Sequence, residues 1–351
     1  MPIHVLVIAA AMLTSMLLTP AASRLAVHFG VIDQPGPRKV HLAPIPLWGG
    51  LAIYGATLVA VLLFSWNLDF ASWLQIAAIG VGASVLVIVG SLDDRGVLHH
   101  QIKLQVAMPV VALILIGAGI QSTVLTAIFG GARIWAVADI ALTLLWVVGI
   151  TAAFSILDHM DGLCAGVAAV ASAFFLFFAI SEGQLLVSTL AAAVMGAALG
   201  FLRWNFNPAR IFMGDGGAMF LGFMMATLGL KLRITSVPDL HAAAIPLFIL
   251  AIPIFDTTLV TISRMRRHLI PFASPGKDHT SHRLSNLGLG HKRTVMVVWS
   301  IGILTGITSI ILERVSLTAG IAIIAAAVVA AGVAIVALER CPFERQGAPK
   351  I

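Results

Sequence analysis

The sequence predicts an all-α, polytopic membrane protein, and two observations support this fold class. Of the 351 residues, 60% are hydrophobic and only 10% are charged, whereas soluble domains carry roughly 25% charged residues. Apolar stretches of about 20 residues, the length of a membrane-spanning helix, recur along the whole chain. A soluble domain is therefore excluded, as is a disordered chain, because disorder requires low hydrophobicity.

About eleven of these stretches are expected to cross the bilayer as helices, all within one integral domain formed by residues 1–338. The first is interpreted as a span because it has no cationic segment in front of it, unlike a cleaved signal peptide. Residues 339–351 are expected to form a short cytoplasmic tail. The expected spans are residues 3–24, 47–66, 73–91, 102–120, 134–154, 162–181, 185–202, 211–230, 241–262, 294–312 and 316–338.

The Lys and Arg residues orient these spans, because cytoplasmic loops are enriched in both. The map places 17 of the 21 on the side of the C-terminus and leaves four, Arg133, Lys231, Arg233 and Arg314, on the other. We therefore expect an outer N-terminus, a cytoplasmic C-terminus, and a location in the plasma membrane or bacterial inner membrane. The net charge of +6 follows from this asymmetry and is not interpreted as nucleic-acid binding. The loops expected in the cytoplasm are about residues 30–46, 92–101, 155–161, 203–215 and 263–293.

Ten of the 15 acidic residues also fall on the expected cytoplasmic side. Acidic residues contribute little to membrane orientation, so another cause must collect them there. Most lie at helix ends in polar loops, whereas a proton or ion pathway would more often place them along the spans. These carboxylates predict a functional site at the cytoplasmic face.

Carboxylates are paired in two of these loops. Asp93 and Asp94 are adjacent at the end of a span, where they repel each other unless Mg²⁺ or a transferred proton neutralises them; a solvated helix end is the alternative. Asp158 and Asp161 are three residues apart and share one face if this segment is helical. Asp161 alone could instead cap the next helix.

Two further loops combine glycine, proline and cations. The first loop contains Arg38, Lys39 and His41, which suit either a membrane anchor or a cationic lip for an anionic substrate or lipid headgroup. The segment Gly214-Asp215-Gly216-Gly217 opens a span. Such a turn at a helix N-terminus resembles an anion cradle with a metal ligand beside it.

The last motifs lie in and after the ninth expected span. Asp256 is inside that span, which makes it a functional candidate, with a structural hydrogen bond as the alternative. In the long loop that follows, His279 and His282, with Lys277 and Arg283, suit a diphosphate. Zinc is the competing interpretation, but neither a cysteine set nor a clear third ligand accompanies the two histidines.

Taken together, these motifs resemble those of the polyprenyl-phosphate N-acetylhexosamine-1-phosphate transferases, in their order and in their sidedness. The resemblance runs from about Asp33 to Leu284. The eleven spans and the His-x-x-His-Arg-Leu loop are more similar to the WecA-like branch than to MraY, whose loop carries a triple-His run. The family implies phosphoryl transfer: a polyprenyl phosphate attacks the β-phosphorus of a UDP-sugar, UMP leaves, and a polyprenyl diphosphate sugar forms.

The resemblance also implies roles for individual residues. Asp93 would hold or deprotonate the lipid phosphate with help from Asp94, and Asp215 would bind Mg²⁺, with Mn²⁺ as a substitute ion. His279 would act in the loop that closes over the diphosphate. Asp161 and Asn205 would contact uridine. The residues for which substrate contacts are implied, with the role of Asp256 left open, are Arg38, Lys39, His41, Asp158, Asp161, Asn205, Phe212, Asp256, His282 and Arg283.

The chain departs from the family pattern at three positions. Ala152 and Ser155 stand where the family usually has Asn, and the second of these Asn residues helps to bind Mg²⁺ in some members. Ser155 offers only a hydroxyl, so metal coordination there is expected to be weaker or mediated by water. His159 stands where the family commonly has Gly or Asn, which predicts an altered affinity or sugar preference.

The leading hypothesis is a transferase that moves N-acetylhexosamine-1-phosphate, GlcNAc-1-phosphate above others, onto undecaprenyl phosphate at the cytoplasmic face and starts a cell-envelope glycan such as lipopolysaccharide or teichoic acid. Its expected partners are a UDP-N-acetylhexosamine, undecaprenyl phosphate, the bilayer and a second copy of the chain, with no nucleic acid. Two alternatives remain: a membrane transporter, whose inverted repeats are not evident, and a non-catalytic scaffold for lipid-linked glycan assembly.

Overall fold

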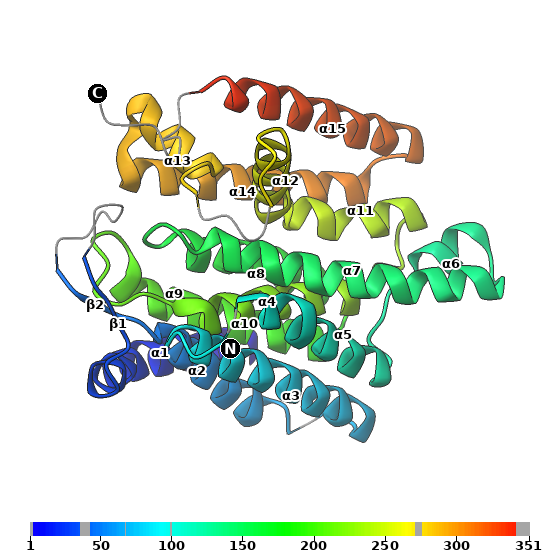
Figure 1. The fold of residues 1–351 in the computed structure, drawn as a ribbon. Coiled ribbons are helices and arrows are strands. Elements are labelled where there is room, and N and C mark those ends of the chain that lie inside the picture. The colour runs from blue at the N-terminus through cyan, green and yellow to red at the C-terminus, as the bar shows by residue number, and fades with distance from the viewer. Residues whose placement is uncertain (1–2, 36–42, 67, 99, 271–275, 342–351) are drawn as a thin grey trace.

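The structure is a computed structural model that describes all residues except 1–2, 36–42, 67, 99, 271–275 and 342–351. The described chain is mainly helical, as expected (Figure 1). Its two π-helical turns are η1 (Lys103–Ala107) and η2 (Ser285–Leu289). The α-helices are α1 (Ile3–His28), α2 (Gly49–Phe64), α3 (Phe70–Asp93), α4 (His100–Ile102), α5 (Met108–Gly117), α6 (Val124–Phe129), α7 (Arg133–Leu157), α8 (Leu163–Ser181), α9 (Leu185–Asn205), α10 (Gly214–Lys231), α11 (Asp239–Ile249), α12 (Ala251–Met265), α13 (Thr280–Leu284), α14 (Gly290–Arg314) and α15 (Leu317–Glu339).

Seven helical segments of the described chain are long and apolar enough to cross a membrane, which confirms a polytopic membrane protein. They are α1, α3, α7, α8, α9, α15 and the continuous stretch Thr280–Arg314 that contains α14. The pair α11 and α12 is an eighth candidate, bent by 74°. Pro253 lies in the first turn of α12, and because proline has no N–H to donate to the preceding turn, it accounts for this break.

The number of spans is where the structure and the eleven-span map differ. Each of the eleven expected spans contains a helix, but α2 has 16 residues, which gives roughly 24 Å at 1.5 Å per residue, less than the hydrocarbon core of about 30 Å. The segment Lys103–Gly117 is also short. Helix α10 opens with the polar Gly-Asp-Gly-Gly turn and is almost completely buried, so it needs no lipid-facing apolar surface. Eleven spans therefore remain a prediction.

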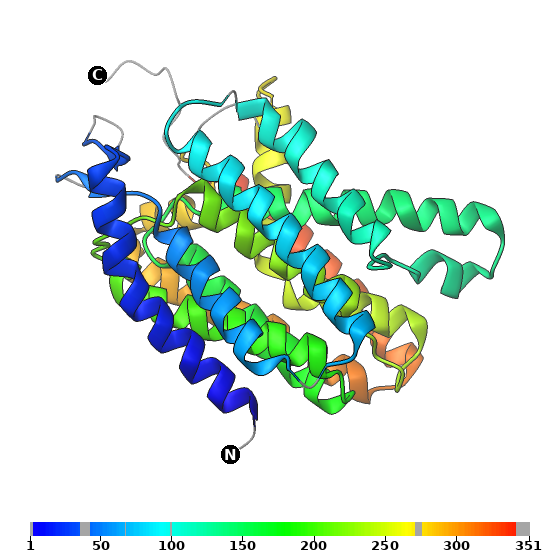
Figure 2. The ribbon, with the colours of Figure 1, turned by 90° about the horizontal axis from the view of Figure 1, so that it is seen from below.

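Helix α10 lies at the centre of the bundle, packed against α2, α3, α7 and α8. Helices α1, α2 and α3 lie side by side on one face (Figure 2). A short antiparallel pair of strands, β1 (Ile32–Asp33) and β2 (Ile45–Pro46), follows α1. This pair and α13 lie at one end of the molecule, and α6 lies at the other (Figure 1). The bundle therefore has a polar-loop end at which distant parts of the chain meet.

Candidate active site

A cavity of about 600 Å³ opens at this polar-loop end. All five loops that the sequence places in the cytoplasm contribute to its wall, although they are separated by up to about 250 residues of sequence. Its polar and functional lining residues include Asp33, Asp94, Asp158, His159, Asp161, Asn205, Asn207, Phe212, Gly214, Asp215, Lys277, His282 and His291. The arrangement brings the predicted motifs into one site. Arg38, Lys39 and His41 lie outside the described residues.

The packing of glycine on glycine brings the catalytic candidates of α3 and α10 together. Gly90 of α3 lies directly against Gly216 of α10, so that a Cβ on Gly90 would overlap the backbone of Gly216 and Asp215. Gly50 of α2 meets Gly217 in the same way. The Gly-Asp-Gly-Gly turn therefore acts as a close-contact surface, and α3 can end beside Asp215 because no side chain separates the two helices.

Three aspartates and one lysine meet where α3 and α10 touch. Nζ of Lys103 donates to Oδ2 of Asp93 at 2.9 Å and also forms an ion pair with Asp215. Oδ1 of Asp94 accepts a hydrogen bond from the backbone N–H of Asp215 at 2.9 Å. The hydroxyl of Ser155 donates to Oδ1 of Asp215 at 3.1 Å. Asp93, Asp94 and Asp215 are therefore brought together as predicted, and Ser155 lies beside them.

The carboxylates outnumber the cation in this cluster, and the pKa values of two nearby aspartates are raised. Burial raises the pKa of Asp94 to about 7, and the charges of Asp215 and Asp93 add to the increase. Burial likewise raises the pKa of Asp158 to about 8, with Asp215 and Asp94 as the next contributors. A cluster of this kind favours either a proton or a bound cation, because each ionised carboxylate destabilises its neighbours.

Oδ2 of Asp94 identifies the position at which a cation fits. This oxygen is buried and has no hydrogen-bond partner within the described part of the chain. It lies against Gly214, where a Cβ would collide with it, and Gly214 has a φ of +74° that favours glycine. An unpartnered buried carboxylate oxygen beside Asp215 suits a hard divalent cation that takes oxygen ligands. The residues present therefore fit Mg²⁺.

Asp161 and Asn205 stabilise the loop around residues 205–211, which also lines the cavity. Oδ2 of Asp161 accepts from Nδ2 of Asn207 at 3.1 Å and from the backbone N–H of Ala209 at 3.0 Å. Asn205 accepts from the N–H of Gly162 at 3.0 Å and donates to the carbonyl of Ile211 at 2.9 Å. Both residues line the cavity, but these bonds already give each a structural role.

Asp256 holds in place the loop that carries His279 and His282, called the histidine loop below. This contact matches the alternative in which Asp256 makes a structural hydrogen bond. Its Oδ2 lies 2.8 Å from Nδ1 of His279, and its Oδ1 accepts from the backbone N–H of Thr280 at 2.7 Å. Asp256 and His279 are both buried, whereas His282 lines the cavity. The loop therefore presents His282 to the site and keeps His279 behind it.

Three residues of metal-ligand type lie close together, so the structure offers the third ligand that the zinc interpretation lacked in the sequence. Ligand atoms of His159, Asp256 and His279 lie within 4.8 Å of one another. The rings of His159 and His279 are stacked with centroids 4.0 Å apart, however, and lone pairs in the planes of stacked rings do not converge on one ion. Burial lowers the pKa of His159, and His279 and His282 lower it further, which favours a neutral imidazole at His159.

The structure does not bring Arg283 to the cavity, although the resemblance implied a substrate contact. Its side chain is fully buried and donates to Oγ of Ser263 at 2.8 Å, to the carbonyl of Leu338 at 2.6 Å and to Oε1 of Glu339 at 2.7 Å. Arg283 therefore joins the histidine loop to the end of α15. The position of the Arg283 side chain gives no support to the implied substrate contact, which stays a prediction.

Lys103 is the main site residue that sequence reasoning did not single out. It was recognised as one of many cations on the cytoplasmic side, and nothing in its neighbourhood forms a motif. The available signal was its place at the start of an apolar span, ten residues after Asp93. Ser281, His291 and Asn207 are likewise not recognisable, because each is a single polar residue in a segment that the sequence predicts to be a loop.

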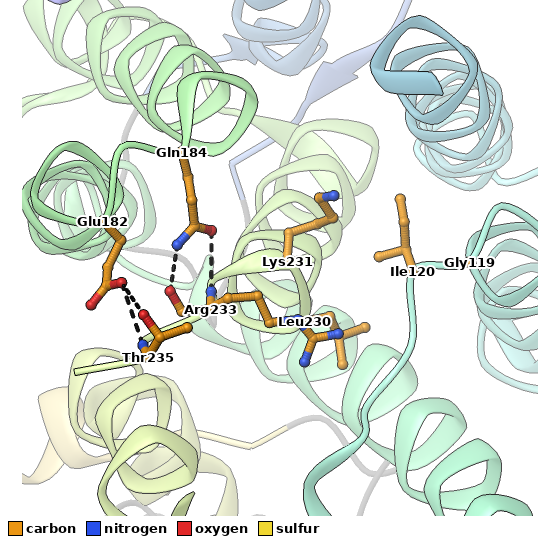
Figure 3. A pocket seen from close by; sticks show the side chains of 8 residues that line it. All are labelled: Gly119, Ile120, Glu182, Gln184, Leu230, Lys231, Arg233 and Thr235. Carbon is orange, nitrogen blue, oxygen red and sulfur yellow. Dashed lines mark hydrogen bonds between the residues drawn. The ribbon is translucent and has the colours of Figure 1, made fainter. Parts of the chain in front are cut away.

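A second cavity, of about 290 Å³, lies at the opposite end of the bundle, where α10 finishes. Its polar groups bind one another (Figure 3): Glu182 accepts from the hydroxyl of Thr235 at 3.0 Å, and Gln184 hydrogen-bonds the backbone of Arg233. Nζ of Lys231 donates to Gln75 at 2.6 Å. These contacts join the loops at that end of the molecule.

Fold and site together define a polytopic helical membrane protein with an acidic site at one end of its bundle. Residues 76–233 match the model of the family described as glycosyl transferase family 4. The chain is 36% identical over 309 residues to a probable undecaprenyl-phosphate N-acetylglucosaminyl 1-phosphate transferase of Bacillus subtilis. The matched region covers 87% of this chain and 84% of the relative.

Two further relatives carry similar names. A decaprenyl-phosphate N-acetylglucosaminephosphotransferase of Mycolicibacterium smegmatis is 31% identical over 335 residues, 87% of this chain and 82% of the relative. An undecaprenyl-phosphate alpha-N-acetylglucosaminyl 1-phosphate transferase of Escherichia coli K12 is 27% identical over 287 residues, 79% of this chain and 75% of the relative. The chain belongs to glycosyl transferase family 4.

Proposed function

We propose that this protein transfers GlcNAc-1-phosphate from UDP-GlcNAc to undecaprenyl phosphate, releases UMP, and so starts a cell-envelope glycan. The observation that carries the proposal is the convergence of Asp93, Asp94 and Asp215 at a cavity formed by five separate loops. The acceptor and the transferred group come from the names of the relatives, which are polyprenyl-phosphate N-acetylglucosaminyl-phosphate transferases. The UDP-sugar donor is what the family resemblance implies. An oxygen of the lipid phosphate attacks the β-phosphorus, and the bond from that phosphorus to UMP breaks.

The proposal includes the orientation of the site. Eleven spans, an outer N-terminus and a cytoplasmic C-terminus place all five loops on the cytoplasmic face of the inner or plasma membrane. The asymmetry of 17 against four Lys and Arg residues supports this arrangement. A cytoplasmic cavity at the membrane surface is reached by the lipid from the bilayer and by the UDP-sugar from the cytosol.

Mg²⁺ is the proposed cofactor, with Mn²⁺ as a substitute. Asp215 and Asp94 would hold the ion. Lys103 forms ion pairs with both Asp93 and Asp215 and so connects Asp93 to this site. When bound, the ion supplies positive charge to the diphosphate. Ser155, which donates to Asp215, would orient this carboxylate, and the hydroxyl would replace the Asn that many family members have there.

The chain's own residues supply the remaining chemistry. Asp93 is proposed to hold or deprotonate the lipid phosphate. Lys103, whose ammonium group is 2.9 Å from Asp93, would offset part of the negative charge that the carboxylates and the phosphate bring together. Bringing two anions together in reactive geometry is the main task of a phosphoryl transferase.

The proposed nucleotide site is the part of the cavity lined by Asp158, Asp161 and Phe212. His282 and Lys277 line the cavity from the histidine loop. Arg38, Lys39 and His41 are proposed to contact phosphate or lipid from the first loop. His279 is proposed to act through this loop, and a homodimer is part of the same proposal.

A transfer assay with the purified full-length chain tests the function. Undecaprenyl phosphate and Mg²⁺ are supplied with radiolabelled UDP-GlcNAc, UDP-GalNAc or UDP-MurNAc-pentapeptide, and label in the organic phase is measured. We expect labelled lipid with UDP-GlcNAc. Label with another sugar corrects only the sugar. No labelled lipid and no UMP with any of the three would exclude the transferase, and flux of unmodified substrate into sealed vesicles would then indicate transport.

A further inference from the structure

His159 lies between α7 and α8 and connects two walls of the cavity. Nδ1 of its ring is 2.9 Å from the carbonyl of Ile156, so in the neutral ring this nitrogen carries the proton. Nε2 is then an acceptor, and the hydroxyl of Ser281 in α13 donates to it at 2.5 Å. One imidazole thus joins segments that are 122 residues apart in the sequence.

The same ring contacts both histidines of the loop. The ring of His159 is stacked on His279, with centroids 4.0 Å apart and planes at 26°, and on His282, with centroids 4.6 Å apart and planes at 29°. His279 is fixed from its other side by Asp256. The three imidazoles therefore pack as one cluster, in which His279 and His282 are tilted by 54° with centroids 5.6 Å apart, and His159 is the member that comes from another loop.

Helix α13 needs such support because it is short. It has five residues and leads into the π-helical turn Ser285–Leu289, where Gly288 has non-helical backbone angles and a kink separates α13 from the long helix α14. Asp256 holds its first residue through the backbone of Thr280, and Arg283 holds its far end. His159 supports the middle, where Ser281 and His282 lie, so the direction in which His282 faces the cavity depends on His159.

We propose that His159 is a positioning residue that sets the orientation of His282 toward the diphosphate of the nucleotide sugar, through its hydrogen bond to Ser281 and its stack with both loop histidines. The inference rests on the proposed function for the identity of the substrate. The side chain of His159 thus connects the loop around residues 155–161 to the loop around residues 263–293. The proposed position of the lipid phosphate, near Asp93 and Lys103, is not part of this link.

The test is a double-mutant cycle on the purified full-length protein. His159→Phe keeps a flat ring for the stack and removes the acceptor, and Ser281→Ala removes the donor. Each is expected to raise the KM for UDP-GlcNAc about five- to tenfold, the effect of one lost hydrogen bond, with an unchanged KM for undecaprenyl phosphate. Because both changes break the same bond, the double variant should resemble either single variant. Ser300→Ala removes an exposed hydroxyl of α14 and is the matched control.

Folding is followed in parallel by the melting temperature in detergent, and a UDP titration with Mg²⁺ gives a binding readout that does not depend on turnover. Single variants with wild-type KM and UDP affinity would overturn the assignment, as would additive effects or equal increases in both KM values. A wild-type protein that makes no product refutes the proposed function instead. An active wild type with unaffected variants refutes only the role of His159.

Discussion

The carboxylate of Asp94 accepts a hydrogen bond from the backbone N–H of Asp215 at 2.9 Å, across 121 residues of sequence. This bond turns one carboxylate oxygen of Asp94 toward the polypeptide and leaves the other buried without a partner in the described chain. Two helices that meet through Gly90 and Gly216 make the bond possible. The geometry of the proposed metal site therefore depends on helix packing as much as on the acids themselves.

Gly90→Ala should separate these helices and disable the site. The added methyl group would meet the backbone of Gly216, which cannot move aside as a flexible side chain could, and a displacement of about 1 Å can cost about 100-fold in rate. We expect turnover near 1% of wild type. Gly80→Ala on the same helix is the control, because its Cβ meets no atom within 4 Å, and a matching loss there would argue against the packing explanation.

Lys103 should be required for its charge. Lys103→Met leaves Asp93 and Asp215 without their shared cation, and removal of a preorganised electrostatic contact typically costs about 100- to 1,000-fold in rate. Lys103→Arg keeps the charge and should retain more activity than the Met variant. The measurement is kcat with both substrates saturating. Similar activities for the Met and Arg variants would show that the charge is not used.

Mg²⁺ alone should stabilise the folded protein. An ion at 100 times its Kd contributes about 2.7 kcal/mol, so the melting temperature should rise when Mg²⁺ is added without substrates and fall when EDTA removes it. In Asp94→Asn the increase should disappear. Asp239→Asn, an exposed acid at the start of α11, should retain it. An unchanged response in Asp94→Asn would remove this residue from the metal site.

Asp278 should stabilise the histidine loop to the same extent at pH 6 and pH 8. Burial tends to raise its pKa, but hydrogen bonds from Arg264 and Arg267 outweigh burial and lower the pKa to about 2. A lowered pKa means that the stabilisation is complete above the unfolded value of about 3.9 and is lost only as the pH falls toward 2.

Asp278→Asn should therefore destabilise by about 3–5 kcal/mol, the effect of breaking a buried ion pair, at both pH values. Thermal unfolding in detergent measures it. A loss present at pH 6 and absent at pH 8 would contradict the assignment of this carboxylate as permanently ionised.

Much of the fold and site could be predicted from the sequence because hydropathy and motif order are local signals. The helix-rich membrane fold follows from apolar length, and the polar loops that line the cavity follow from the breaks between apolar stretches. Their cytoplasmic side, inferred from charge alternation, stays a prediction. Asp93, Asp94 and Asp215 were each recognisable within a short motif, and the structure places them together.

The missed features are contacts between segments. Lys103 stands in no motif, and the packing of η1 on α3 and of α3 on α10 brings it between Asp93 and Asp215. Arg283 looks like a substrate cation in the sequence, but the end of α15 supplies Glu339 and buries it. Span number was also hard to predict, because a central helix such as α10 can be polar at its start when other helices surround it.

The most direct test of the central claim is the stoichiometry of UMP and lipid-linked sugar released by the purified protein from UDP-GlcNAc and undecaprenyl phosphate, with and without Mg²⁺. We predict equal amounts of both products with Mg²⁺, almost none with EDTA, and less than about 1% of the wild-type rate in Asp215→Ala, as expected when a charge-stabilising group is removed. A near-normal rate in Asp215→Ala, or UMP formed without lipid-linked sugar, would contradict the proposed site.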